Sequence, residues 1–155
     1  MEGMMSWTTG TLIDGWNTIL FSQAAGTTAS PGTADQVPYG TEFNWSTART
    51  VVSRGPHLNK QALTKSVGGV NYSGSFTIDL HAAANTVRNN IMSAVNAGTR
   101  IKVTLRIGGV TSGEQYIWDQ CIVSQDGAVD PSATATYTFN WEADSLSYTA
   151  GTAFA

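Results

Sequence analysis

Few side chains in this sequence could take part in catalysis or hold a metal ion. The chain has two histidines, His57 and His81, and one cysteine, Cys121. His57 follows Arg-Gly-Pro in an expected turn and His81 precedes an expected helix, and neither lies in a pattern typical of zinc ligands. Cys121 lies among apolar neighbours in an expected strand, which favours a buried, inert thiol over a nucleophile. We therefore expect no metal and no cofactor.

The acidic residues do not form a recognisable catalytic pair. Glycoside hydrolysis needs two carboxyl groups at a set separation, and the spacing of the carboxylates does not indicate one. The sequence contains neither a Gly-x-Ser-x-Gly nucleophile motif nor a phosphate-binding Gly-x-x-x-x-Gly-Lys loop. We therefore predict that the protein is not an enzyme. The carboxylates considered are Asp119, Asp126, Asp130, Glu142 and Asp144.

Five tryptophans leave a carbohydrate-binding β-sandwich open as an alternative function. Exposed indole rings on a sheet can stack on sugars, whereas buried ones fill a core or a subunit interface. Trp141 shares a predicted strand face with Tyr137 and Phe139, which favours the core or interface reading. The five are Trp7, Trp16, Trp45, Trp118 and Trp141.

The composition limits the possible partners. Only 12% of residues are charged, about half the usual share, and Thr, Ser, Asn and Gly take their place. Such a surface is easily dehydrated, which fits either burial on assembly or simply a Thr/Ser-rich β protein. The net charge is −3 and no Lys/Arg block occurs, which argues against phosphate binding. We expect no membrane partner, because no apolar run approaches the ~20 residues of a span, and residues 1–10 lack the features of a secretory signal.

Alternation of apolar and polar residues predicts a mainly β fold with one α-helix. The alternation is clearest at 99–107, where every second residue from Ile101 to Ile107 is apolar. One segment has helical spacing instead and predicts a helix at about 84–97, with Asn85 as its cap and Gly98 at its end. The other expected strands are 11–21, 42–55 (one or two short strands), 71–80 (with a bulge or bend at Gly74), 114–123 and 134–142.

These elements predict a single β domain over residues 11–148, a β-sandwich or barrel-like fold with the helix flanking the sheet. An N-terminal arm (1–10) precedes it and a C-terminal tail (149–155) follows. Residues 22–42 form a long loop of Ala, Gly, Ser, Thr and Pro without apolar periodicity. Compact domains rarely carry structureless loops longer than about 12–15 residues. We therefore expect this loop to act outside its own domain.

The arrangement resembles the major tail tube proteins of tailed bacteriophages and the related tube subunits of contractile injection systems. The residues that carry the resemblance are GSFTIDLHAAANTVRNNIMSAVNAGTRIKVTLRI (74–107) and CIVSQDGAVDPSATATYTFNWEAD (121–144). The resemblance implies hexameric rings that stack into a tube, with strands of six subunits joined in one inner β-barrel through which DNA passes. The helix would lie outside the barrel and the long loop would reach the next ring. A tail terminator or completion protein of similar fold is the alternative.

The resemblance also implies a location and partners. The protein would be part of the virion tail, assembled in the host cytoplasm. Its main partner would be itself, with sheath, tape-measure, baseplate or tail-tip, and terminator proteins as further partners. DNA would pass through the lumen without specific binding.

Two groups of residues are expected to contact neighbouring subunits. The first comprises apolar residues of the N-terminal arm and the long loop, which gain burial only against a partner. The second is the basic face of the strand at 99–107, which we place at a subunit contact or on the outside because cations would hold DNA in a lumen. The residues are Met4, Met5, Trp7, Pro31, Val37, Pro38 and Tyr39, and Arg100, Lys102 and Arg106.

The polar faces of two other strands are candidates for the lumen. They carry hydroxyls, an amide and carboxylates, which do not attract phosphate. Joining sheets through neighbours in a ring would also remove open sheet edges, which this chain has few charges to protect. The lumen candidates are Ser73, Ser75, Thr77, Asp79, Thr136, Thr138, Asn140 and Glu142.

Overall fold

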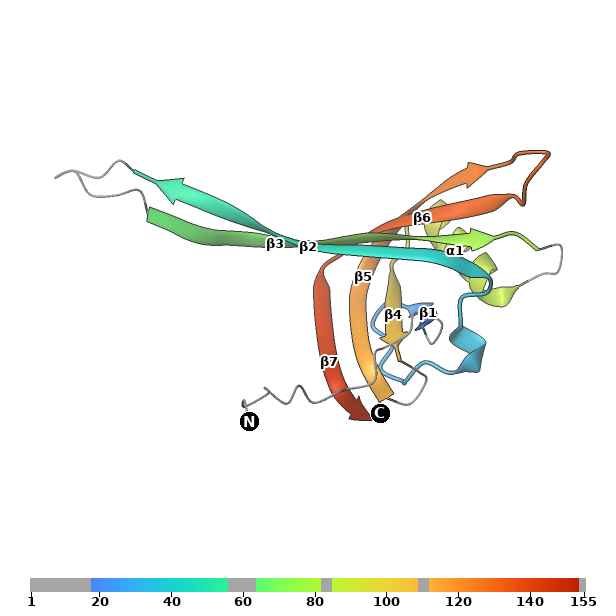
Figure 1. Ribbon diagram of the computed structural model, residues 1–155, viewed down its shortest axis with the longest axis horizontal. Helices are drawn as coiled ribbons and strands as arrows, with labels where there is room; N and C mark the ends of the chain where they lie inside the picture. Colours follow the sequence, from blue (N-terminus) through green and yellow to red (C-terminus); the bar gives the residue numbers. More distant parts are fainter. Residues whose placement is uncertain (1–17, 56–63, 82–84, 109–111, 154–155) are drawn as a thin grey trace, which may run out of the picture.

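The computed structural model describes residues 18–55, 64–81, 85–108 and 112–153. Seven strands and one α-helix account for most of them, which confirms the predicted fold class (Figure 1). A single short 3-10 helix, η2, lies between β1 and β2. The elements are β1 (Thr18–Ala24), η2 (Thr33–Asp35), β2 (Gly40–Arg54), β3 (Thr64–Asp79), α1 (Thr86–Ala97), β4 (Ile101–Ile107), β5 (Ser112–Ala128), β6 (Thr136–Ala143) and β7 (Ser145–Ala153).

The strands form two antiparallel layers that share β5. Strand order is β1-β4-β5-β6-β3-β2, and β7 also pairs with β5. Residues 112–121 of β5 lie with β1, β4 and β7 in what we call the first sheet. Residues 122–128 of β5 lie with β6, β3 and β2 in the second sheet. In Figure 1 the β2–β3 pair crosses above β4, β5 and β7, so the layers run in different directions.

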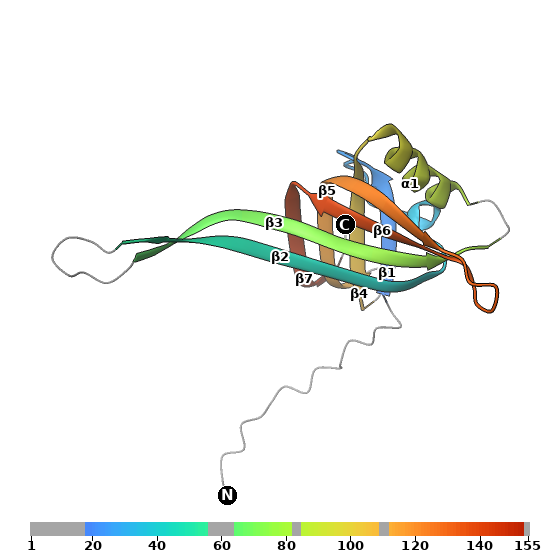
Figure 2. The same ribbon diagram turned by 90° about the horizontal axis from the view of Figure 1, so that it is seen from above.

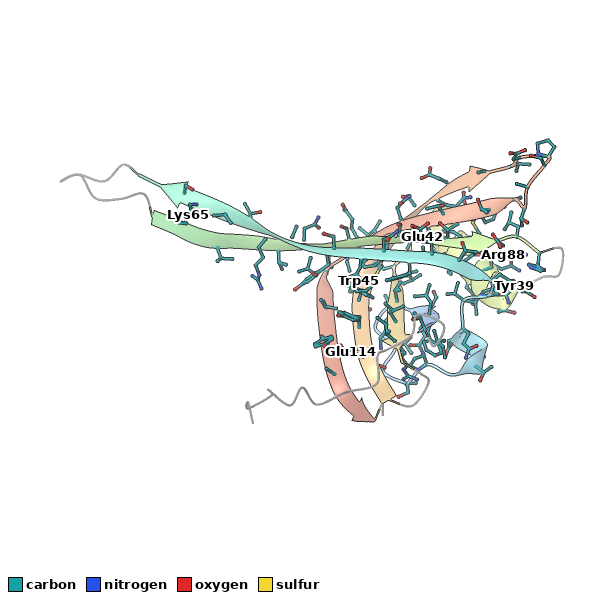
Figure 3. All side chains as sticks on the ribbon, viewed as in Figure 1. Tyr39, Glu42, Trp45, Lys65, Arg88 and Glu114 are labelled. Atoms are coloured by element: carbon teal, nitrogen blue, oxygen red, sulfur yellow. The ribbon has the colours of Figure 1, made fainter. Side chains whose placement is uncertain are left out.

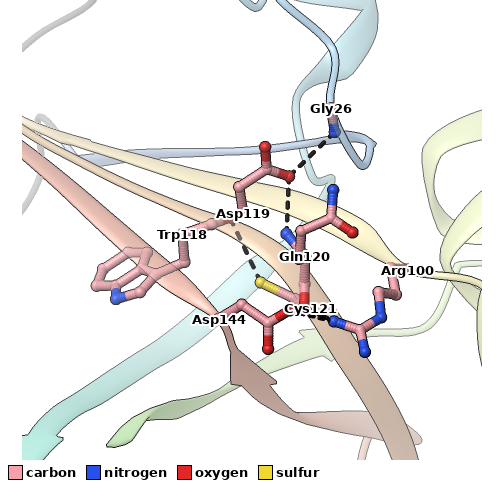
Figure 4. A network of polar contacts seen from close by, with 7 residues as sticks. All are labelled: Gly26, Arg100, Trp118, Asp119, Gln120, Cys121 and Asp144. Carbon is pink, nitrogen blue, oxygen red and sulfur yellow. Dashed lines mark hydrogen bonds and ion pairs between the residues drawn. The ribbon is translucent and has the colours of Figure 1, made fainter. Parts of the chain in front are cut away.

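A bend in β5 lets one strand serve both sheets. Gln120 has φ 56°, a left-handed conformation that is uncommon outside glycine. The Asp119 Oδ1 atom accepts hydrogen bonds from the Gln120 N–H (2.7 Å) and the Gly26 N–H (3.1 Å). Arg100 donates to the Gln120 carbonyl and pairs with Asp144 at 2.5 Å (Figure 4). These contacts tie the bend to the loop after β1 and to the β6–β7 connection.

The core lies between the two sheets. Trp118 of the first sheet and Phe76, Phe139 and Trp141 of the second are almost fully buried, and the Trp118 and Trp141 ring centroids are 4.9 Å apart. In Figure 2, α1 lies on the opposite side of the body from β2. Its apolar face joins the core through Val87, Ile91 and Ala94.

Both predicted ends of the helix are confirmed. The Asn85 side chain accepts a hydrogen bond from the Arg88 N–H at 3.0 Å, which satisfies a free donor of the first turn. Gly98 adopts φ 71° at the C-terminus, the left-handed conformation that glycine permits there. Val87, Ile91 and Ala94 occur at spacings of four and three residues, and all three are buried. The helical period in the sequence therefore identified the buried face.

Gly74 does not form the predicted bulge. Its pairings with Trp45 and Trp141 continue the ladder on both sides without a register shift. A Cβ atom here would lie 2.3 Å from Cζ2 of Trp141 and 2.5 Å from the carbonyl oxygen of Asn44. Glycine is needed because the Trp141 ring lies against the backbone at this point.

Several element boundaries also differ from those expected, and both β3 and β5 are longer than the strands predicted at 71–80 and 114–123. β2 is one continuous strand over the region expected to hold one or two short ones. β7 covers most of the predicted C-terminal tail 149–155, because backbone pairing with β5 holds a strand whose own sequence is mostly small and polar. β1 and β2 take up both ends of the predicted loop 22–42, and only residues 25–39 connect them.

The β2–β3 hairpin extends well beyond the rest of the second sheet. β6 pairs with β3 only over Tyr72–Asp79, so residues 48–54 and 64–71 pair with each other alone. We call these two segments the arm, and Figure 1 shows them projecting from the body. Val51 is 61% exposed and Val67 is 67% exposed. Because Val51 and Val67 are paired, the two exposed side chains lie together on one face of the arm.

Candidate functional site

The register of β3 and β6 brings all eight lumen candidates onto one surface. Directly opposed residues of an antiparallel pair lie on the same face, and every candidate on β3 is paired with one on β6. The Thr77 and Thr138 hydroxyl oxygens are 3.0 Å apart and hydrogen-bonded. The pairs are Ser73–Glu142, Ser75–Asn140, Thr77–Thr138 and Asp79–Thr136.

Two more strands widen this surface. Glu42, Asn44 and Ser46 of β2 pair with Thr77, Ser75 and Ser73, and Ser124 and Asp126 of β5 pair with Asn140 and Thr138. Their contribution depends on long-range register, which the sequence pattern did not reveal. We call the whole set the polar face. It comprises Glu42, Asn44, Ser46, Ser73, Ser75, Thr77, Asp79, Ser124, Asp126, Thr136, Thr138, Asn140 and Glu142.

The polar face forms because these four strands bury their other side. Phe43, Phe76 and Phe139 are paired across the sheet and point into the core. Since side chains alternate along a strand, the residues next to them point outward. A hollow of ≈490 Å³ is lined by Ser73, Gly74, Ser75, the exposed Ile122, Val123, Ser124, Asn140, Trp141 and Glu142. The result is a sheet with one apolar and one hydroxyl-rich side.

The charge on the polar face is entirely negative. It carries Glu42, Asp79, Asp126 and Glu142, and none of its members defined above is Lys or Arg. The Asn44 side chain donates to Glu42 at 2.9 Å and Asn140 donates to Asp126 at 3.0 Å. These amides hold the carboxylates in place without neutralising them. A surface of this kind repels a polyphosphate rather than holding it.

The second sheet has two open edges within the described part of the chain. β2 pairs only with β3, and residues 122–128 of β5 pair only with β6. Backbone N–H and C=O groups at such edges can pair with another strand. The sheet could therefore be extended at both sides by further copies.

The expected loop contacts are largely made within the chain. Val37 donates its N–H to the Leu20 carbonyl at 2.8 Å and packs against the core. Pro31 and Pro38 are half-buried. Tyr39 is 55% exposed and stacks on His81 with ring centroids 3.6 Å apart. Of the predicted contacts, Met4, Met5 and Trp7 lie outside the described residues.

The basic residues of β4 are also engaged inside the chain. Lys102 donates to the Thr27 carbonyl at 2.6 Å, and Arg100 pairs with Asp144. Arg106 is only 5% exposed, donates to Gln115 at 2.7 Å and lies over the Phe21 ring. Burial lowers the pKa of the Arg106 guanidinium. Both faces of β4 are covered, so the alternation in its sequence does not separate a buried side from a solvent-exposed side, and the Arg106 side chain is buried within its own chain.

No catalytic or metal-binding arrangement is visible in the described ranges. Cys121 is fully buried, and this burial raises the pKa of its thiol to about 12. The predicted inert cysteine is therefore confirmed as buried. Outside the gaps in the structure, no three His, Cys, Asp or Glu side chains gather where they could hold a metal ion. His57 lies outside the described residues.

The tryptophans do not form a sugar-stacking platform in the described chain. Trp118 and Trp141 are buried, and only Trp45 is partly exposed, at 39%. Trp7 and Trp16 lie outside the described residues. Among the helices that the structure describes, none is long and apolar enough to span a membrane.

Comparison with known proteins finds similarity in structure only. No family model matches the sequence, and no curated protein matches it significantly. Among solved structures, the SPP1 tail tube superposes with a TM-score of 0.70 at 12% identity, over 91% of this chain and 81% of that one. A chain of the sheath–tube complex of PVC, an extracellular contractile injection system, in its extended state gives 0.67 at 9% identity, over 92% and 94%. The tube-terminating cap of the anti-feeding prophage gives 0.66 at 11% identity, over 95% and 100%.

Proposed function

We propose that this chain, which has the fold of the tail tube proteins of phages and contractile injection systems, is a structural subunit that assembles into stacked hexameric rings. The stack forms a tail tube through which DNA passes into the host. In this proposal the protein has no enzymatic activity and belongs to the virion tail, having been assembled in the host cytoplasm. The partners in this proposal are further copies together with sheath, tape-measure, baseplate or tail-tip, and terminator proteins.

The second sheet is the observation that carries the proposal. It has a polar face whose charged residues are all acidic, an apolar face covered by the core, and two unpaired edges. Joining the β2 edge of one copy to the β5 edge of the next closes a barrel and removes the open edges. The polar face then lines the lumen, where DNA slides without being held.

The loop, the N-terminal arm and the β2–β3 arm supply contacts beyond the barrel. Residues 1–10 and the loop within 22–42 tie one ring to the next, with Tyr39 as the most exposed of the described apolar loop contacts. The β2–β3 arm adds an exposed valine surface that the sequence did not reveal. A contact between two different surfaces of one chain repeats from copy to copy, so it can generate rings and filaments.

Electron microscopy tests the proposal directly. Purified protein is concentrated at several salt concentrations, imaged in negative stain and sized by light scattering. We expect rings with six-fold averages, or tubes of even diameter, with a central channel. A well-folded sample that stays monomeric at every concentration and salt condition would overturn the proposal.

A terminator or completion protein of the same fold is the second candidate. The similarity to the anti-feeding prophage cap, which covers the whole of that chain, favours this candidate. A terminator forms single rings that bind the end of a tube, whereas a tube protein forms long stacks. The lengths of the assemblies in the same micrographs separate the two. Titration with oligosaccharides, followed by Trp fluorescence, tests the carbohydrate-binding alternative.

A further inference from the structure

Strand register fixes how the two open edges of the second sheet stand relative to each other. Asn44 of β2 pairs with Ser75 of β3. Ser75 also pairs with Asn140 of β6, which in turn pairs with Ser124 of β5. Asn44 and Ser124 are therefore level with each other at opposite edges. Neighbouring strands are antiparallel throughout, so the edges of copies arranged around a ring axis meet as an antiparallel pair.

A closed ring requires these edges to be staggered. Strands of a closed barrel tilt by roughly 35–45° from its axis. For four strands about 4.8 Å apart, with a rise of ~3.4 Å per residue, this tilt displaces one edge relative to the other by about 4–5.6 residues per copy. Edges joined without a stagger would leave the strands parallel to the axis. They would also set Glu42 directly against Asp126 of the next copy, which places two like charges together.

Side-chain alternation selects one value in this range. A shift by an odd number of residues turns the polar side chains of a strand to the other side of the sheet, whereas the polar face has to continue from copy to copy. The stagger is therefore about four residues, the even number in the range. One sense sets residues 44–48 of β2 against 124–128 of β5. The opposite sense leaves only residues 40–42 against 122–124, where β2 already has a register shift, so the first sense is favoured.

We propose that the β2 edge of one copy pairs with the β5 edge of the next in this single register, with Asn44 opposite Ala128, Ser46 opposite Asp126 and Ala48 opposite Ser124. This inference rests on the proposed function and adds to it the residues that face each other when the ring closes. Because the register sets the stagger, it also sets the tilt of the strands around the lumen.

The side chains on the apolar side of the sheet fit this register. Trp45, labelled with Glu42 on β2 in Figure 3, is 39% exposed and packs beside Phe43 on that side. In the proposed register it lies opposite Gly127, where the absence of a side chain leaves room for the indole ring. Phe43 lies opposite Val129, which directly follows β5 and is 82% exposed. Two exposed apolar side chains, Trp45 and Val129, are thus covered by the same pairing.

The polar side of the sheet fits it as well. The Ser46 hydroxyl lies opposite the Asp126 carboxylate of the next copy and can donate to it, while Asn140 already donates to the same group within the chain at 3.0 Å. Glu42 falls past the end of β5, which is Ala128. No carboxylate of β5 therefore lies opposite another carboxylate, in contrast to the joint without a stagger.

Disulfide cross-linking tests the register. Ala48→Cys/Ser124→Cys places the two thiols directly opposite each other, at a Cα separation of about 4.5–5.5 Å between copies. Within one chain the two residues lie at opposite edges of the sheet, three strand spacings or about 14 Å apart, so they cannot be bridged there. Oxidation of the assembled double variant should give a ladder of covalent multimers that ends at the hexamer, which Ser124→Cys alone should not give.

Two further pairs are matched controls because they share Ser124→Cys. Ser46→Cys/Ser124→Cys is opposed only if the stagger is two residues, and Asn44→Cys/Ser124→Cys only if there is none. In the proposed register the Ser46 pair is displaced by two residues, about 7 Å along the strand, which is beyond the reach of a disulfide. Both pairs should give far weaker ladders than the Ala48 pair under the same oxidation.

A bulky side chain at Gly127 gives an independent test. Gly127→Leu should raise the protein concentration needed for assembly about tenfold or more, because the new side chain meets the Trp45 ring of the neighbouring copy. Within its own chain an added Cβ has only ordinary contacts, the nearest being Nε2 of Gln125 at 3.4 Å. Circular dichroism and urea unfolding should therefore stay close to wild type. Ala128→Leu is the matched control, since its side chain points into the open lumen, and it should assemble at the wild-type concentration.

The outcomes separate this inference from the proposed function. If the wild-type chain forms no rings or tubes, the proposed function fails and the inference with it. If rings form but the Ser46 or Asn44 pair cross-links best, or none of the three pairs does, the register is overturned while the tube assignment stands. Assembly of a folded Gly127→Leu variant at the wild-type concentration would also overturn the register.

Discussion

Gly74 is a position where one methyl group should affect the whole second sheet. Because an added Cβ would meet the Trp141 ring and the Asn44 carbonyl, Gly74→Ala must displace a buried aromatic or a paired strand. We expect a loss of about 1–3 kcal/mol in the free energy of unfolding, as for other overpacked cores. Urea unfolding measures it. Gly69→Ala is the control, since its Cβ would meet nothing within 4 Å, and an equal loss in both variants would contradict the explanation.

The fold should protect the Cys121 thiol from deprotonation and from chemical labelling. Burial raises the pKa of its thiol from 9.0 to about 12, so the native protein keeps the thiol protonated when the unfolded chain has lost its proton. The stabilising effect is complete below pH 9 and is lost as the pH rises toward 12. We expect no reaction with a disulfide reagent at pH 8 until the protein unfolds. Rapid labelling of the native protein at that pH would contradict the assignment.

At the scale of the element, the bend in β5 depends on one carboxylate. Asp119 accepts from the backbone N–H groups of Gln120 and Gly26, so Asp119→Ala leaves both donors without this partner. We expect a loss of about 1–2 kcal/mol in the free energy of unfolding. Asp119→Asn retains an acceptor oxygen and should lose less. Chemical denaturation of both variants is the measurement, and equal losses would show that the hydrogen bonds do not hold the bend.

The elements also show how far the sequence could predict the fold. Alternation in 71–80 and 134–142 identified the polar and apolar faces of β3 and β6, because both strands have one side on the core. The arm was missed because Val51 and Val52 are adjacent and Gly68 and Gly69 interrupt the opposite strand, so neither segment alternates. β7 was not predicted because backbone pairing with β5, and not alternation in its own sequence, holds this segment as a strand. Pairing over long sequence separations does not appear in local periodicity.

At the scale of the whole molecule, the acidic polar face predicts that the assembled protein does not bind DNA. We expect assembled wild-type protein not to retard DNA in a gel, even at low salt. Ser75→Lys/Asn140→Lys places two cations on paired residues of the polar face and should create binding that weakens as salt rises. Ser147→Lys/Thr149→Lys is the matched control, with the same charge change on exposed residues of β7. Equal binding by both variants would place the polar face away from the DNA path.

The shared strand has a consequence for how the chain could be rearranged. Residues 112–121 and 122–128 of β5 belong to different sheets, yet they are continuous in one strand with a bend at Gln120. A circular permutant with new termini in the 129–135 turn would keep every ladder intact. One opened beside Gln120 would remove the covalent link that β5 makes between the two layers and leave their angle to the packing and to the other connections, such as the short one between β6 and β7.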